Sequence, residues 1–351
     1  MIDVDALRHR IDEALTAAME ELDARLIDYG ASLTPVAESM RAFVAGGKRI
    51  RPLLLQLGFR AAGAEDETQV MGPALALELL HTCALVHDDV IDKAETRRGR
   101  PSLHSDFAAA HRRMSWRGDP EAYGEAVAIL VGDLALVYSD DLFLRARVDT
   151  DRLVAGFKHF TQLREEVMAG QYLDLHHATS GAGSRSDALT VATLKSGRYS
   201  VSRPLEVGAV LASADDTFID GLRAFGDPLG RAFQVRDDLL GLFGDEATTG
   251  KSTSSDLREG KRTLIIAEAL ARLDDESRTA LERGLGKPDL SDTTADELKA
   301  LLRASGAKAA AESYVRESVT EANLALSRLA IDEPVRQALS GFVDLLSYRT
   351  A

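Results

Sequence analysis

The 351-residue sequence has few of the features that mark secreted or membrane proteins. It contains one cysteine, Cys83, so no intramolecular disulfide can form. No uninterrupted apolar run reaches the roughly 18 residues that span a bilayer. The first residues also lack the basic and apolar regions of a secretory signal. We therefore expect a cytoplasmic protein without a transmembrane segment.

The charge balance is acidic. The chain has 42 Lys and Arg residues and 56 Asp and Glu residues, which gives a formal net charge of −14. This balance argues against general nucleic-acid binding, which needs a positive surface. An anionic ligand would need cations concentrated at particular places, and the sequence contains such places.

Prolines are few, nine in all, and alternating Val, Ile and Thr runs bounded by turn residues are almost absent. Apolar residues instead recur at helical spacing. The predicted helices cover residues 3–28, 35–45, 51–63, 70–93, 121–145, 150–178, 187–213, 215–243, 261–272, 294–304, 306–328 and 333–348. Loop composition marks 112–120, 179–186 and 244–260, and the last is long enough for a functional lid. The simplest interpretation is an all-α helical bundle in which residues 1–351 form a single domain.

Three aspartates follow a helix that is apolar nearly all round, residues 73–87. Such a helix belongs in the centre of a bundle. Asp88 and Asp92 share one helix face, and Asp89 lies one position round. Carboxylates at the rim of an apolar helix repel one another unless a cation joins them, and hard oxygen ligands suit magnesium. The alternative is a solvated acidic helix end.

Three arginines come directly after this cluster: Arg97, Arg98 and Arg100. Guanidinium groups match phosphate oxygens with two parallel hydrogen bonds. A metal site next to arginines is the chemistry of a diphosphate site. Simple charge compensation between Asp and Arg is the alternative.

A second acidic pair, Asp237 and Asp238, again ends an apolar helix and again precedes a loop. Two acidic clusters on separate helices can face each other and clamp one polyanion through several metal ions. Such a clamp would stabilise the charge on a departing diphosphate.

A basic segment, Gly46 to Pro52, combines two glycines with Lys48, Arg49 and Arg51. Pro52 suits the first turn of a helix, and a helix start with cations is an anion site. A basic surface turn is the alternative. Further cations occur at Lys195, Arg198, Lys251, Arg258, Lys261 and Arg262. The segment 244–260 could close over phosphate and exclude water from a reactive cation.

Taken together, these residues resemble the trans-isoprenyl diphosphate synthase family, also called polyprenyl synthetases. The run Asp88-Asp89-x-x-Asp92-x-x-x-x-Arg97-Arg98-Gly99-x-Pro101 is similar to the family's first aspartate-rich motif, and Gly46 to Pro52 to its homoallylic-phosphate loop. Gln171 and Asp174, Lys195-Ser196, Phe233-Gln234 with Asp237-Asp238, and Lys251 with Lys261 follow in the family's order. The sequence as a whole resembles those of actinobacterial geranylgeranyl diphosphate synthases.

The resemblance implies an isoprenoid-synthase bundle with the active-site cavity at its centre. It implies about three magnesium ions on the allylic diphosphate, held by Asp88, Asp89, Asp92, Asp237 and Asp238. It implies allylic-substrate contacts by Arg97, Lys195, Ser196, Gln234, Lys251 and Lys261. Isopentenyl diphosphate would be held by Lys48, Arg51, His81 and Arg98, and Asp174 would accept from a lysine of the long loop.

The mechanism implied by this resemblance is ionisation, condensation and elimination. The allylic carbon–oxygen bond breaks, the alkene of isopentenyl diphosphate attacks the carbocation, and a proton passes to the released diphosphate. The implied catalytic residues are Asp88, Asp89, Arg97, Lys195, Asp237 and Lys251. No side-chain nucleophile is needed, and the sequence shows no Ser-His-Asp or Cys-His pairing that would supply one.

The second motif departs from the family at one position. The family usually has a third aspartate four residues after the first, and this chain has Gly241 there. Asp245 comes one turn later, but we expect Gly244 to end the helix before it. We expect water to replace the missing ligand, which would weaken the metal site.

Product length in the family depends on residues just upstream of the first motif. An aromatic residue four or five positions before Asp88 would stop the growing chain early, and Ala84 and Cys83 stand there. Leu80, Leu79 and Ala76 come next along the same face. These small residues above a leucine layer favour geranylgeranyl diphosphate, with a longer polyprenyl product or farnesyl diphosphate as alternatives.

Two other classes compete with this interpretation. A class I terpene cyclase also uses an Asp-rich helix, but it would have an Asn/Ser/Glu metal motif late in the chain and no need for Lys48 and Arg51. A non-catalytic subunit of a heteromeric synthase tends to lose aspartates that this chain retains. The family resemblance also implies a homodimer formed through buried helices.

Overall fold

The structure, a computed structural model, describes residues 2–97, 99–244 and 253–347. Nearly all of them are helical, so the predicted all-α class is confirmed. The α-helices are α1 (Val4–Tyr29), α2 (Thr34–Val44), α3 (Ile50–Ala61), α4 (Met71–Ile91), α5 (Leu103–Arg113), α6 (Pro120–Phe143), α7 (Thr150–Ser180), α8 (Arg185–Val191), α9 (Arg203–Leu211), α10 (Asp216–Phe243), α12 (Ser255–Glu259), α13 (Leu264–Arg272), α14 (Asp275–Gly284), α15 (Asp292–Ala304), α16 (Ala307–Arg328) and α17 (Glu333–Ser347). The other elements are the 3-10 turns η1 (Ala31–Leu33) and η2 (Glu67–Val70), the π-helix η3 (Ala192–Ser202), and the strands β1 (Thr96–Arg97) and β2 (Arg100–Pro101).

The predicted helices agree with the observed ones within about three residues at most ends. Three helices were not predicted, namely α5, α12 and α14. Helix α14 is largely polar, and α12 is a five-residue helix inside the segment interpreted as a loop. The single helix predicted over 187–213 is three elements, α8, η3 and α9.

The chain forms two compact units. The amino-terminal unit comprises residues 3–56 and 64–153, and the carboxy-terminal unit comprises the described part of residues 1–2, 57–63 and 154–351. Each unit has its own buried apolar side chains. That residues 1–351 form a single domain stays a prediction.

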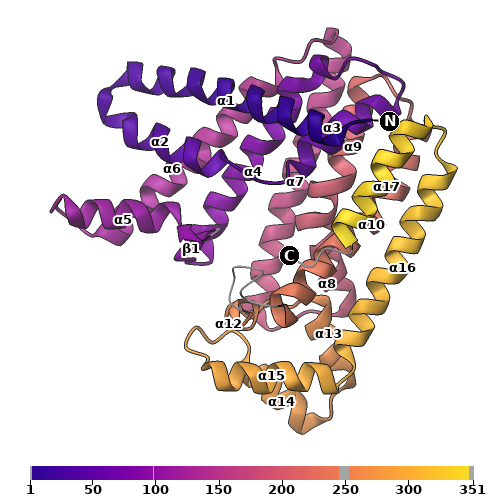
Figure 1. Cartoon of the computed structure of the whole chain (residues 1–351). Helices are drawn as coiled ribbons and strands as arrows, with labels where there is room; N and C mark the ends of the chain where they lie inside the picture. The colour runs from indigo at the N-terminus through magenta and orange to yellow at the C-terminus, as the bar shows by residue number, and fades with distance from the viewer. Residues whose placement is uncertain (1, 98, 245–252, 348–351) are drawn as a thin grey trace. The chain divides into compact units, whose positions relative to one another are not determined.

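Helix α4 is the central helix of the amino-terminal unit and packs along α6, with α1, α2 and α5 as further neighbours (Figure 1). Its Leu75, Leu77 and Leu79 are buried. The close approach of α6 depends on Gly132, where a Cβ would lie 2.2 Å from Nε2 of His87. The apolar helix predicted for the centre of a bundle is therefore confirmed as a core helix.

Among the described residues, the stretch Glu67–Ile91 is long and apolar enough to cross a membrane by length and composition alone. Of its most apolar window, 67% is buried inside the protein. Such burial is typical of a core helix, because a membrane-spanning helix would present much of its surface to lipid.

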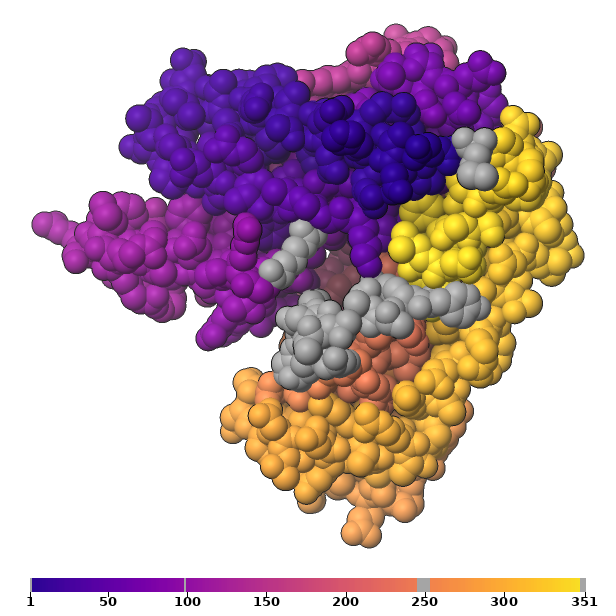
Figure 2. All heavy atoms as spheres, viewed as in Figure 1, coloured from indigo at the N-terminus to yellow at the C-terminus, as the bar shows by residue number. Residues whose placement is uncertain are grey.

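Helix α10 is the central helix of the carboxy-terminal unit and contacts η3, α9, α16 and α17 (Figure 1). Its Gly230 lies against η3, where a Cβ would come within 2.5 Å of the Gly197 Cα. The helices α16 and α17 (yellow) pack on each other at the surface of this unit, as Figure 2 shows. The glycine contact lets α10 approach the π-helix backbone directly.

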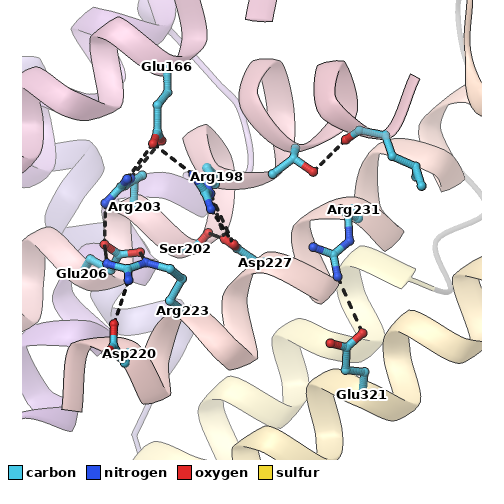
Figure 3. A network of polar contacts seen from close by, with 12 residues as sticks. Glu166, Arg198, Ser202, Arg203, Glu206, Asp220, Arg223, Asp227, Arg231 and Glu321 are labelled. Atoms are coloured by element: carbon cyan, nitrogen blue, oxygen red, sulfur yellow. Dashed lines mark hydrogen bonds and ion pairs between the residues drawn. The ribbon is translucent and has the colours of Figure 1, made fainter. Parts of the chain in front are cut away.

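A network of ion pairs holds the π-helix to its neighbours (Figure 3). Arg198 of η3 contacts Glu166 of α7 and Asp227 of α10, each at 3.1 Å. Ser202, also on η3, donates a 2.6 Å hydrogen bond to Asp227. Because η3 also carries Lys195 and Ser196, this network fixes the backbone that presents two of the predicted substrate-binding residues.

The same network continues into a fully buried centre. Glu206 of α9 is 0% exposed and accepts from Arg203 at 2.6 Å and from Arg223 at 3.1 Å. Arg203, only 3% exposed, also forms two hydrogen bonds with Glu166 at 2.6 and 2.9 Å. Buried charges of this kind are stable only while each keeps its partners.

We expect Glu206→Gln to lower the free energy of unfolding by about 3 kcal/mol, because Arg203 and Arg223 would lose a charged partner in a buried setting. The matched control is Asp220→Asn, since Asp220 pairs with the same Arg223 but its side chain is 72% exposed. The control should cost less than about 1 kcal/mol. Urea unfolding measures both, and equal losses would contradict a stabilising role specific to the buried centre.

Candidate functional site

The first acidic cluster occupies the last turn of α4. Asp92 is the C-cap residue, and its amide donates to the Asp88 carbonyl at 2.8 Å. Asp89 is almost completely buried, at 1% exposed, whereas the Asp88 side chain is 26% exposed. The apolar helix therefore buries one carboxylate of the cluster and leaves its neighbour accessible to a ligand.

Arg97 is presented to this cluster by a small antiparallel hairpin, β1 and β2, in which Thr96 pairs with Pro101. The Arg97 Nε donates to Oδ1 of Asp89 at 2.8 Å, and Nη2 contacts the same oxygen. Nη2 also lies 4.0 Å from Oδ2 of Asp88. The structure thus shows the charge compensation between Arg97 and Asp89 that the sequence analysis gave as the alternative, and contact of Arg97 with a diphosphate stays a prediction. Arg98 lies outside the described residues.

The electrostatics of Asp89 favour a cation. Burial raises the pKa of Asp89, the hydrogen bonds and charge of Arg97 act in the opposite direction, and the nearby Asp88 carboxylate raises the pKa further. Its Oδ2 is buried and has no hydrogen-bond partner among the described residues. A buried carboxylate oxygen without a partner is costly, so the site is suited to gaining a positive ligand.

These residues fit magnesium. The donors are carboxylate oxygens, which magnesium prefers, and no residue that the structure describes donates to Oδ2 of Asp89. Within residues 2–97, 99–244 and 253–347, no three His, Cys, Asp or Glu side chains converge as a ready-made metal cage. Magnesium does not need such a cage, since it is usually held by one or two carboxylates together with substrate phosphates and water.

The basic segment before α3 has an unusual backbone. Gly46, Gly47 and Arg49 all have positive φ angles, of 79°, 106° and 51°. Arg49 is buried and pairs with Asp12 and Glu78, each at 2.7 Å, so it ties the segment to α1 and α4. Lys48 is exposed beside it. The buried Arg49 thus holds the backbone in the strained form that presents Lys48.

Arg51 and His81, the other residues predicted to hold isopentenyl diphosphate, are both half-buried. Arg51 lies in the first turn of α3, and His81 lies on α4 seven residues before Asp88, on the same helix face. Both belong to the amino-terminal unit, together with Lys48 and the first acidic cluster.

The second acidic cluster lies near the end of α10, which stops at Phe243 with Gly244 as its C-cap, as predicted. Asp238 is buried, and Nε2 of Gln234 donates to its Oδ1 at 2.7 Å. Burial holds the pKa of Asp238 well above its usual range, and the charges of Asp256 and Asp237 add to the effect. Gln234, predicted as a substrate contact, supports Asp238 in this structure.

Lys195 lies in η3 where α7 comes closest, since a Cβ at Gly170 would be 2.4 Å from the Lys195 nitrogen. Its Nζ donates to Oδ2 of Asp174 at 2.7 Å. We predicted that Asp174 accepts from a lysine of the long loop. The structure gives it Lys195 as a partner, and Lys251 lies outside the described residues. Ser196 follows Lys195 and is half-buried.

Asp256 lies beside Gly241 of α10, a proximity that was not predicted from the sequence. It lies on α12, and its Oδ1 is 3.3 Å from Nζ of Lys261. Lys261 also contacts Glu259 at 2.5 Å. The α12 helix begins in a segment interpreted as a loop, and nothing in the spacing from Asp238 indicates that Asp256 returns to α10.

Besides Lys195 and Lys261, two more of the additional cations noted in the sequence, Arg198 and Arg258, have structural partners. Arg198 belongs to the ion-pair network of η3. Arg258 donates to the Leu290 carbonyl at 3.2 Å and to Asp292 at 2.7 Å, so it fastens α12 to the start of α15 and the residues just before it. These contacts do not require a phosphate ligand.

The residues predicted to set product length lie along α4. Cys83 and Leu80 are buried, at 5% and 2% exposed, and Ala84 is half-buried. The Cys83 Sγ lies 3.7 Å from Nδ1 of His87, and burial raises the pKa of this thiol to about 12. Cys83 is therefore a protonated, unreactive side chain at neutral pH, as expected for a small apolar lining residue.

Comparison with known proteins agrees with this geometry. The model of the polyprenyl synthetase family matches residues 34–303. A geranylfarnesyl diphosphate synthase of Aeropyrum pernix is 30% identical over 336 residues, covering 93% of this chain and 99% of that protein. A geranylgeranyl diphosphate synthase of Sulfolobus acidocaldarius is 31% identical over 255 residues, 72% of each protein.

Among solved structures, a geranylgeranyl pyrophosphate synthase from Corynebacterium glutamicum, complexed with isoprenyl diphosphate and magnesium, is 36% identical with a TM-score of 0.94. The match covers 99% of this chain and 100% of that chain. The aspartate-rich motifs, the helical fold and these matches agree with one another. The chain therefore belongs to the polyprenyl synthetase family of trans-isoprenyl diphosphate synthases.

Proposed function

We propose that this chain condenses isopentenyl diphosphate head to tail with allylic diphosphates and that geranylgeranyl diphosphate is its main product. The observation that carries the proposal is the first acidic cluster, where Arg97 donates to the buried Asp89 and lies 4.0 Å from Asp88. The second carboxylate oxygen of Asp89 has no hydrogen-bond partner among the described residues. An arginine and unsatisfied carboxylates together suit a metal–diphosphate ligand.

We propose that Asp88, Asp89, Asp92, Asp237 and Asp238 hold about three magnesium ions. When bound, these ions would neutralise the diphosphate as it leaves. Arg97 binds the allylic diphosphate and keeps Asp89 charged. Lys195, held by Asp174, and Lys261, held by Asp256, bring further positive charge to the leaving group. Lys251 would join them.

The second substrate, isopentenyl diphosphate, would be held by Lys48, Arg51, Arg98 and His81. The positive φ angles around Lys48 expose its side chain on a backbone that buried Arg49 makes rigid. No residue of this group forms a covalent bond with substrate. These residues position the alkene for attack and keep water away from the carbocation.

We expect the purified protein, given magnesium and isopentenyl diphosphate, to extend dimethylallyl, geranyl or farnesyl diphosphate. Removing the metal with EDTA should abolish elongation, and Asp89→Asn should lower kcat about a hundredfold or more, because the charged partner of Arg97 and the metal ligand are lost together. Dephosphorylated alcohols identified by chromatography give the measurement.

The control for this variant is Asp106→Asn, which removes one exposed carboxylate of α5 in the same unit and should leave kcat unchanged. Absence of elongation from every primer with magnesium present would refute the proposal. Formation of a cyclic hydrocarbon would then indicate a terpene cyclase, and activity restored by a partner protein would indicate a synthase subunit.

The product length rests on the small side chains of Cys83 and Ala84 above Leu80. The named relatives make products of different lengths, one geranylfarnesyl and one geranylgeranyl diphosphate, so the family alone leaves the length open. We favour geranylgeranyl diphosphate because two small residues admit a tail beyond farnesyl, and leucines at the next layer then limit it.

We expect Ala84→Phe to shorten the main product to farnesyl diphosphate. Ala84→Leu, with a smaller side chain, should give a mixture. Ala84 suits this test better than Cys83, because Ala84 is half-buried and an added ring has room to extend. If the wild-type protein, Ala84→Phe and Ala84→Leu all gave the same product, Ala84 would not line the cavity that receives the growing chain.

We also propose that the protein is a cytoplasmic homodimer. Helix α6 exposes Leu130 and Val137, at 62% and 61%, and its C-cap residue Leu144 is 56% exposed. These three residues are spaced seven apart, which places them on one apolar stripe of the kind that packs against another helix. A second copy of the chain is the partner we propose, through the same helix.

We expect Val137→Glu to convert the dimer to a monomer, because two copies would bury like charges at the centre of the stripe. Light scattering after size-exclusion chromatography gives the mass. Leu324→Glu is the control, since Leu324 is also exposed, at 52%, but lies on α16. A monomeric wild-type protein would refute the proposed dimer.

A further inference from the structure

The turn that joins α5 to α6 is a surface that the proposed reaction does not use. This α5–α6 tip, residues 111–123, projects from the other helices of the amino-terminal unit (Figure 1), and Figure 2 shows the same projection. Its large apolar side chains Met114 and Trp116 are 63% and 49% exposed. Large apolar side chains exposed together on a projecting turn indicate a surface that docks onto another body.

The α5–α6 tip is held in a fixed shape. His111 is buried, at 4% exposed, and its Nε2 donates to the Arg117 carbonyl at 3.0 Å. The Trp116 amide donates to the His111 carbonyl at 3.2 Å. The Trp116 ring also packs edge-on against the Tyr123 ring, with 5.4 Å between the centroids. The tip therefore presents Trp116 in one orientation, and docking would not have to order the turn first.

The tip is basic in an acidic protein. Arg112, Arg113 and Arg117 lie within six residues, whereas the net charge of the whole chain is −14. Arg112 forms an ion pair with Glu121, and Asp119 accepts from the Glu121 amide as the N-cap of α6. Arg113 and Arg117 are exposed, and neither has an ion-pair partner among the residues that the structure describes. Their charge is therefore available to an anionic partner.

A membrane surface that contains anionic phospholipid matches both properties of the tip. Tryptophan favours the headgroup region of a bilayer, because its ring is apolar and its N–H group is polar. Arginines near such a surface are attracted by the anionic headgroups. A symmetric contact between the tips of two copies would instead bring the arginines of both copies together. The combination of exposed Trp116 with unpaired arginines therefore favours lipid over a second copy of the tip.

We propose that the α5–α6 tip attaches the protein to anionic phospholipid membranes, with Met114 and Trp116 in the headgroup region and Arg113 and Arg117 on the lipid phosphates. The attachment is peripheral, because only side chains of a turn enter the lipid. It needs neither metal nor substrate and does not depend on the proposed function. A synthase held at this surface would release its apolar product where that product can enter the bilayer.

Trp116 is the only tryptophan of the chain, so intrinsic tryptophan fluorescence reports on the tip alone. The test adds vesicles of phosphatidylcholine and phosphatidylglycerol to the full-length protein, without metal or substrate. We expect these anionic vesicles to shift the emission to shorter wavelength and to protect it from quenching by acrylamide. Vesicles of phosphatidylcholine alone should do neither. Added salt should weaken binding to the anionic vesicles, because it screens the arginines.

A first pair of variants tests the charge of the tip. Arg113→Gln combined with Arg117→Gln should raise the half-saturating concentration of anionic vesicles about tenfold or more. The control, Arg8→Gln combined with Arg10→Gln, removes the same charge from α1 in the same unit, where these side chains are 45% and 52% exposed. The control should leave the half-saturating concentration unchanged. Equal effects of both pairs would mean that net charge alone drives binding, which would overturn the proposal.

A second set of variants tests the apolar contact, with binding followed by co-sedimentation with vesicles. Trp116→Ala should abolish co-sedimentation, and the control Tyr29→Ala should not, although Tyr29 is a 78% exposed aromatic residue of α1. Met114→Ser should weaken binding without a change in Tm, because its exposed side chain is outside the ring packing of Trp116 and Tyr123. Normal binding by both Trp116→Ala and Met114→Ser would contradict the proposal.

Three further results would overturn the proposed attachment. The first is a Trp116 emission that anionic vesicles leave unchanged. The second is an emission already protected from acrylamide in the lipid-free protein, because a second copy of the chain would then cover Trp116. The third is equal binding to vesicles with and without phosphatidylglycerol, because the arginines would then have no role. Failure to elongate primers would bear on the proposed function alone, since vesicle binding is measured without substrate.

Discussion

The structure depends on carboxylates placed at the ends of apolar helices, where water cannot solvate them well. Asp89 lies near the end of α4 and Asp238 near the end of α10, and both are buried. Each has one main hydrogen-bond donor among the described residues, Arg97 for Asp89 and Gln234 for Asp238. Charge buried with so little compensation lowers stability. Such a carboxylate gains most when a cation binds, which supports the proposed magnesium sites.

The ion-pair network of the carboxy-terminal unit shows the opposite arrangement (Figure 3). Glu206 is as buried as Asp89, yet Arg203 and Arg223 both donate to it. A carboxylate with two guanidinium partners has nothing to gain from a metal. Glu206 and Asp89 are therefore equally buried but differ in their partners. This difference in partners is what marks Asp89, and not Glu206, as the candidate ligand for a cation. The ion pairs that hold the π-helix carrying Lys195 are formed by Arg198, Glu166 and Asp227. None of these three residues is among the predicted metal ligands.

The helices and the two Asp pairs could be predicted from the sequence, because helical periodicity and short motifs are both local patterns. The helices α4, α6, α7 and α10 were predicted almost to their ends, and the hairpin that turns Arg97 back onto Asp89 joins residues only eight apart. Contacts between residues far apart in the sequence could not be predicted from it. Arg49 pairs with Asp12 and Glu78, Lys195 with Asp174, and neither pairing has a local signature. The π-helix was also missed, because its composition is that of an ordinary helix.

Gly241 illustrates how spacing and geometry diverge. A motif defined by spacing assigns the third carboxylate to position 241 and treats a glycine there as a loss. In the folded chain, the absence of a side chain at 241 is what admits Asp256 to the same space. The position of Asp256 depends on α12 and on its bond to Lys261, not on the helical spacing of α10. No spacing rule within the motif could therefore have predicted that this carboxylate lies beside position 241.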